Sequence, residues 1–203
     1  MLWTSGQAAV LIGALVTGVL VITYFHRGLT GAAPANTQRP QAAAGDSSPP
    51  DWFSALPFNC VGGTRLATGP AAAIAYVDGV SAGTRTGYDV VTIQFAGVPP
   101  AETSLSTQSN AKFVSGAGAQ PVTLKGNAGA LVTLHGTDGH AKYLGPTDVK
   151  TTYPVVLELR EVQDYGGTVQ WAIGLSRTPC YRMAFLDSPT RLVIDFRAGS
   201  ATN

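Results

Sequence analysis

The chain has 203 residues, of which 45% are hydrophobic, and it contains 24 glycines and 13 prolines. Thirteen lysines and arginines stand against twelve aspartates and glutamates, which leaves a formal charge of +1. Without a dense basic block, nucleic acid and anionic lipid are excluded as main partners. The composition suits one all-β domain joined to a flexible arm and differs from that of a disordered chain.

The first predicted element is a membrane segment within residues 1–27. Residues 8–25 read AAVLIGALVTGVLVITYF, eighteen residues without a charge. As a helix rising ~1.5 Å per residue, this run would cross most of a ~30 Å hydrocarbon layer. Its length and the interfacial character of residues 24–27 favour a retained anchor over a cleaved signal peptide. A cleavage-like Ala-Pro-Ala at 33–35 leaves a secreted product as the alternative.

A linker is predicted for residues 28–57, because they are rich in Ala, Pro, Ser, Gln and Gly and have few large apolar side chains to bury. A Pro-rich segment extends by ~3 Å per residue, so the linker would hold the next domain well away from the bilayer. Trp52, Phe53 and Leu56 mark where the chain begins to rejoin packed structure. We place the folded domain at residues 58–203.

Cys60 and Cys180 are the two cysteines of the chain. No CxxC motif is present, and two distant cysteines alone cannot form a zinc site. In an oxidising compartment we expect them to form one disulfide, worth ~4 kcal/mol if loop entropy were the whole account. The alternative is two separate buried thiols.

Alternation of apolar and polar residues dominates the chain after Cys60 and predicts β-strands. The pattern occurs in YDVVTIQF, VVLELREV, GTVQWAIGLSR, CYRMAF and RLVIDF. The residues expected to point inward are Val91, Ile93, Phe95, Val155, Leu157, Leu159, Val169, Trp171, Ile173, Leu175, Tyr181, Met183, Phe185, Leu192, Ile194 and Phe196. About eight to ten short strands separated by Gly and Pro turns predict a β-sandwich or barrel of mainly antiparallel strands.

The stretch HGTDGH, residues 135–140, most resembles a metal site. Two glycines flank Thr137 and Asp138 just after a predicted strand, which favours a hairpin turn. A metal would need further ligands, and the nearest candidates, Asp148 and Glu158, are unspecific, so we expect no metal. Nucleophile-elbow, phosphate-loop and dinucleotide motifs are also absent from the sequence, which predicts neither an enzyme nor a cofactor.

Polar side chains on the strands are the remaining candidates for binding. Arginines supply forked donors and aromatic rings supply flat faces, and both suit sugars and carboxylates. Three charges of the last strand lie on one face, although cross-strand ion pairs worth less than ~1 kcal/mol each would explain them equally well. The candidate binding residues are Tyr88, Asp89, Arg182, Arg191, Asp195 and Arg197.

The segments GYDVVTIQF and DSPTRLVIDFRA resemble the first and last strands of the AMIN-like domain family. In that family a strand opening with Tyr-Asp precedes a final strand with a Pro-x-Arg-Leu-Val pattern. The segment between them, YLGPTDVKTTYPVVLELREVQDYGGTVQWAIGLSRTPCYRMAFL, follows the family order, and the resemblance covers residues 77–197. Val90 stands where family members often carry an arginine, which weakens a ligand site carried over from that position.

The resemblance implies a β-sandwich outside the cytoplasmic membrane, related to the AMIN domain of periplasmic amidases and pilus secretins. The charges of His26 and Arg27 alone would place the domain in the cytoplasm, and we let the resemblance outweigh that rule. We therefore expect a single-pass cytoplasmic-membrane protein whose external, non-enzymatic domain binds peptidoglycan or another envelope polymer. The alternative is a protein-interaction domain that recruits an envelope enzyme or a secretion component.

Overall fold

The computed structural model describes residues 49–68, 72–116 and 118–199. All of them belong to one unit, Ser48–Asn203. Within these ranges, no helix is long and apolar enough to cross a membrane. The predicted membrane segment 1–27 and the first part of the predicted linker, residues 28–48, lie outside the described residues.

The described residues are almost entirely β, as predicted. A single four-residue helix precedes thirteen strands in this part of the chain. The elements are α1 (Asp51–Ser54), β1 (Thr64–Ala67), β2 (Ala75–Arg85), β3 (Tyr88–Ala96), β4 (Glu102–Gln108), β5 (Lys112–Ser115), β6 (Gln120–Thr123), β7 (Ala128–His135), β8 (Thr137–Asp138), β9 (Asp148–Lys150), β10 (Val156–Tyr165), β11 (Thr168–Leu175), β12 (Tyr181–Leu186) and β13 (Arg191–Arg197).

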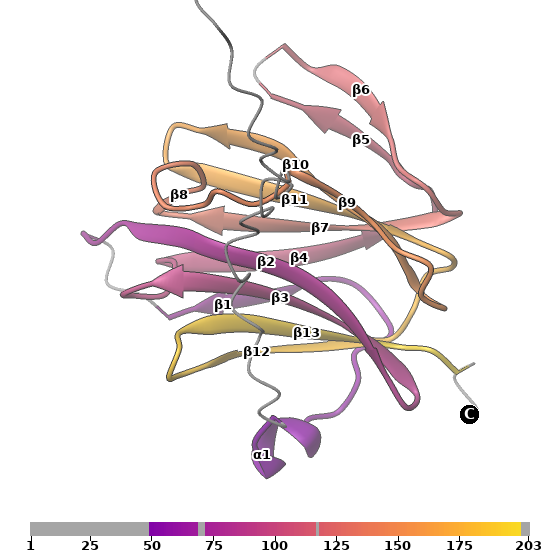
Figure 1. Ribbon diagram of the computed structural model, residues 1–203. Coiled ribbons are helices and arrows are strands. Elements are labelled where there is room, and N and C mark those ends of the chain that lie inside the picture. The colour runs from indigo at the N-terminus through magenta and orange to yellow at the C-terminus, as the bar shows by residue number, and fades with distance from the viewer. Residues whose placement is uncertain (1–48, 69–71, 117, 200–203) are drawn as a thin grey trace, which may run out of the picture. The chain divides into compact units, whose positions relative to one another are not determined.

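Two sheets form the layers of a β-sandwich (Figure 1). The six-stranded sheet has the order β1-β4-β7-β11-β10-β9, and the five-stranded sheet has the order β12-β13-β3-β2-β8. Neighbouring strands are antiparallel except β2 and β8, which are parallel. The hairpin of β5 and β6 forms a separate two-stranded sheet. The mainly antiparallel sandwich confirms the predicted fold class.

The core lies between the two sheets and contains most of the side chains that the alternating pattern assigned to it. The predicted inward residues of β11 and β13 are all fully buried: Val169, Trp171, Ile173, Leu175, Leu192, Ile194 and Phe196. Each large apolar side chain contributes roughly 1.5–3 kcal/mol when it leaves water. These two strands, one in each sheet, therefore hold the layers together.

The prediction is wrong at Leu157, which is only half-buried. The pairing of β10 with β11 has a bulge between Val156 and Glu158. A bulge adds one residue to a strand and shifts the alternation of its side chains. Val156 is therefore buried beside Val155, and the predicted phase returns at Leu159.

The hairpin turn predicted at residues 135–140 is also wrong. β7 ends at His135, Gly136 adopts a φ of 68°, and β8 then pairs in parallel with the start of β2 in the other sheet. The segment therefore crosses between the layers. One of the Gly turns expected between strands does form at Gly166 and Gly167, between β10 and β11, where φ is 61° and 73°, as a type I′ hairpin requires.

The folded part begins before the predicted boundary at residue 58. Phe53 in α1 is fully buried against Val90, Leu186 and Val193, on the face of the five-stranded sheet that points away from the core. We call residues 50–60 the N-terminal lead. At its end, Cys60 forms a disulfide with Cys180, which confirms that prediction.

Candidate functional site

Two of the predicted binding residues form a buried ion pair beneath the N-terminal lead. Arg182 and Asp195 are cross-strand neighbours on β12 and β13. Arg182 Nε and Nη2 lie 2.9 and 2.8 Å from Asp195 Oδ2, and the two side chains are 7% and 1% exposed. Burial raises the pKa of Asp195 above its ordinary value, and the hydrogen bond and charge of Arg182 oppose that shift.

Aromatic rings enclose the Arg182 guanidinium. Its carbon lies 5.1 Å from the ring centre of Phe53, 4.7 Å from that of Phe58 and 5.5 Å from that of Tyr88. Arg182 Nη1 also donates a hydrogen bond to the Ser54 carbonyl oxygen. Cation–π contacts of this kind are worth about 2 kcal/mol or more when water is excluded. Arg182 thus fastens the N-terminal lead to the sheet.

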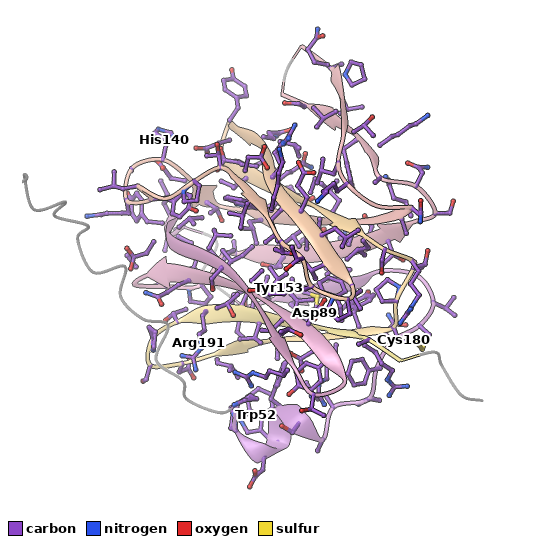
Figure 2. The ribbon with its side chains drawn as sticks, turned by 45° about the vertical axis from the view of Figure 1, so that its right-hand side comes forward. Trp52, Asp89, His140, Tyr153, Cys180 and Arg191 are labelled. Atoms are coloured by element: carbon purple, nitrogen blue, oxygen red, sulfur yellow. A yellow bond between two sulfur atoms is a disulfide. The ribbon has the colours of Figure 1, made fainter. Side chains whose placement is uncertain are left out.

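Asp89 points to the opposite face of the same sheet, into the interior (Figure 2). Its Oδ2 accepts hydrogen bonds from the backbone N–H groups of Val155 and Val156, at 2.6 and 2.9 Å. Its Oδ1 is buried and has no hydrogen-bond partner among the described residues. Asp89 therefore joins β3 of one sheet to the start of β10 in the other.

Arg191 and Arg197 are partly exposed at the two ends of β13. Arg191 Nη1 donates to the Pro189 carbonyl oxygen at 3.0 Å, and the Arg197 guanidinium lies 4.3 Å from the Phe58 ring centre. The six predicted residues therefore do not form one open surface. The N-terminal lead covers the middle of the charged row, and a role of these residues in binding stays a prediction.

An open groove lies where β9, at the edge of the six-stranded sheet, approaches β2 of the other sheet. Its volume is about 370 Å³. The lining residues are Ala82, Lys125, Val149, Lys150, Thr151, Thr152 and Tyr153. Lys125 and Lys150 are exposed, and Lys150 Nζ lies 3.9 Å from Asp148 Oδ2. The Lys125 ammonium has no ion pair among the described residues.

The chemistry of this groove suits an anionic polymer. Two ammonium groups attract negative charge, the Thr152 hydroxyl can donate or accept hydrogen bonds, and Tyr153 adds an aromatic side chain. The Thr151 hydroxyl already donates to the Val156 carbonyl oxygen and accepts from the Tyr153 N–H. The Tyr153 hydroxyl donates to the Ala82 carbonyl oxygen at 3.4 Å, which joins the two walls. Sequence reasoning missed the groove because its lysines lie on separate segments and neither carries a motif.

In a comparison with protein families, the model of the AMIN-like domain matches residues 75–198 of the chain. The match begins where β2 begins and continues through β13. No curated protein and no solved structure matches the chain. The N-terminal lead and β1 lie before the matched range, whereas all seven residues that line the groove lie within it.

Proposed function

Because the chain belongs to the AMIN-like domain family, we propose that it is a non-enzymatic binding module of the cell envelope. In this proposal residues 1–27 hold it at the cytoplasmic membrane, and the domain lies outside the cytoplasm. The Cys60–Cys180 disulfide supports this placement, since structural disulfides persist in oxidising compartments.

The ligand that we propose is peptidoglycan or another anionic polymer of the cell wall. The observation that carries this choice is the groove, with Lys125 and Lys150 on an open surface next to Tyr153. Wall polymers present many carboxylate or phosphate groups along one chain, so a pair of lysines can engage successive charges. Such attraction between exposed charges weakens as salt is added.

Co-sedimentation with purified sacculi tests the proposed ligand. We expect the purified chain to pellet with sacculi at low ionic strength and to be released by salt. A chain that stays wholly in the supernatant would contradict the proposal. If specific envelope proteins retained such a chain instead, the result would favour the alternative role, recruitment of an envelope enzyme or a secretion component.

Protease treatment of spheroplasts tests the proposed placement. We expect protease added outside to digest the domain while a cytoplasmic marker protein survives. Full protection of the domain until the membrane is permeabilised would place it in the cytoplasm and overturn this part of the proposal.

A further inference from the structure

A cluster of possible metal ligands lies outside the groove, where the end of β8 and the segment after it meet the end of β10. One donor atom from each of Asp138, His140 and Asp164 lies within 4.8 Å of the other two. His140, labelled in Figure 2, lies on the loop at the edge of the sandwich. The third residue is Asp164, and neither Asp148 nor Glu158, the two candidates nearest in sequence, belongs to the cluster.

Two of the three donor spacings can be compared with those around a single small cation. His140 Nδ1 lies 3.6 Å from Asp138 Oδ1 and 2.5 Å from Asp164 Oδ2. Ligands bound tetrahedrally to Zn²⁺ at ~2.0–2.2 Å are separated by about 3.4 Å from one another. The first distance fits as it stands, and the second requires the His140–Asp164 hydrogen bond to open by about 1 Å.

Backbone groups hold both carboxylates in position. Asp138 Oδ1 accepts hydrogen bonds from the N–H groups of His140 and Ala141, at 3.0 and 2.8 Å. Asp164 Oδ1 accepts one from the Gly139 N–H at 3.2 Å, which leaves its Oδ2 directed at His140. Metal-binding carboxylates in proteins are commonly oriented by hydrogen bonds of this kind.

Gly139 allows the loop to pass very close to the carboxylates. A Cβ atom at this position would lie 3.0 Å from Asp164 Oδ2 and 3.1 Å from Glu161 Oε2, tighter than ordinary contacts. The absence of a side chain therefore leaves the space between the oxygen atoms open. The carboxylate oxygens of Asp164 and Glu161, both on β10, therefore border an open space beneath the loop.

The cluster gathers negative charge that the protein compensates only in part. Glu161 adds a third carboxylate beside Asp164. Among the described residues, no lysine or arginine forms an ion pair with Asp138, Glu161 or Asp164, and His140 pairs only with the two aspartates. A divalent cation at this position would neutralise charge that His140 alone does not.

We propose that Asp138, His140 and Asp164 bind one divalent transition-metal ion, with Zn²⁺ the best match. An imidazole nitrogen favours Zn²⁺ over Ca²⁺ and Mg²⁺, which prefer sets of oxygen ligands. The bound ion would join the loop after β8 to the end of β10. Three protein ligands leave a coordination position for water or for an anionic group of a partner.

Isothermal titration of the full purified chain, first freed of metal with EDTA, tests this proposal. We expect ZnCl₂ to bind with a stoichiometry of one near pH 7.5 and to raise the melting temperature, whereas MgCl₂ and CaCl₂ do neither. H140Q and D164N should each lower the zinc affinity at least about tenfold. The His140 side chain is 76% exposed, so its substitution leaves the fold intact.

H135Q is the matched control. His135 is an exposed histidine five positions earlier, hydrogen-bonded to Thr168 Oγ1 at 3.2 Å and outside the cluster. This variant should bind zinc like the parent. Failure of the parent to bind zinc, or equal affinity of H140Q and the parent, would overturn the proposal and leave a hydrogen-bonded loop contact. Equal losses in H135Q and H140Q would also overturn it.

Discussion

Arg182 on β12 and Asp195 on β13 face each other across the edge of the five-stranded sheet and form an ion pair that the N-terminal lead buries. A buried pair of this kind costs desolvation energy, which is recovered only when every charge has good partners. Arg182 has them, since it also bonds Ser54 and lies against Phe58, whereas Asp195 Oδ1 is buried and has no hydrogen-bond partner among the described residues. The pair therefore fixes the position of the lead on the sheet.

We expect R182M to destabilise the domain by about 3–5 kcal/mol, because it leaves the Asp195 carboxylate buried without a partner. Urea denaturation followed by tryptophan fluorescence measures this loss. The double variant R182M/D195L, which removes both charges, should recover part of the stability. If the single and double variants were equally unstable, or if R182M cost nothing, the pair would not act in this way.

The apolar part of the same contact can be tested at two adjacent residues of α1. Phe53 is fully buried and Trp52 is 52% exposed. We expect F53A to cost about 3 kcal/mol through lost burial and the cavity that it leaves. The matched variant W52A should cost about 1 kcal/mol or less. Equal effects of the two substitutions on the urea midpoint would contradict the packing described for the lead.

The sequence predicts the sandwich core well, because period-two alternation follows directly from one buried face on each strand. The residues of β11 and β13 show this, and the exception at Leu157 arises from a bulge that alternation cannot signal. Alternation does not predict which segment covers the outer face of the five-stranded sheet. The contact between Ser54 and Arg182 joins residues 128 positions apart, and no local pattern records it.

Both possible binding sites likewise combine residues from separate segments of the chain, which no local sequence pattern connects. Lys125 and Lys150 come together because β9 ends beside the segment before β7, and neither lysine stands out in the sequence. HGTDGH contains two of the three proposed metal ligands, but the third, Asp164, comes from the far end of β10. Only the crossing of the chain between the two sheets brings these elements together.

In the presence of EDTA, we expect the stability of the chain to fall as the pH rises from about 5 to about 8. Burial, and then the charge of Asp164, raise the pKa of Glu161 from 4.5 to about 7. Above about pH 4.5 the folded state therefore retains a Glu161 proton that the unfolded state has released. The stability that this bound proton provides is lost as the pH approaches 7. After allowance for solvent screening, the loss is about 1–2 kcal/mol.

His140 acts in the same direction over this range. The hydrogen bond that His140 donates to Asp164, and the negative charge of that carboxylate, raise the pKa of His140 above its ordinary value of 6.5. The stability that protonated His140 contributes is complete below pH 6.5 and is lost as the pH rises through the pKa of the folded state. Urea midpoints of the parent and E161Q at the two pH values isolate the Glu161 part. E161Q should lose less stability than the parent. An identical pH dependence of both proteins would contradict the assignment.

The central claim, that the lysine groove binds an anionic wall polymer, is tested most directly when the purified K125A/K150A variant is sedimented with sacculi at increasing salt concentrations. K112A/K142A is the matched control, because it removes the same charge from two exposed lysines outside the groove. We expect K125A/K150A to lose most of its binding at low ionic strength, at least about tenfold in affinity, while K112A/K142A binds like the parent. Equal binding by the two double variants, whether strong or weak, would contradict the claim.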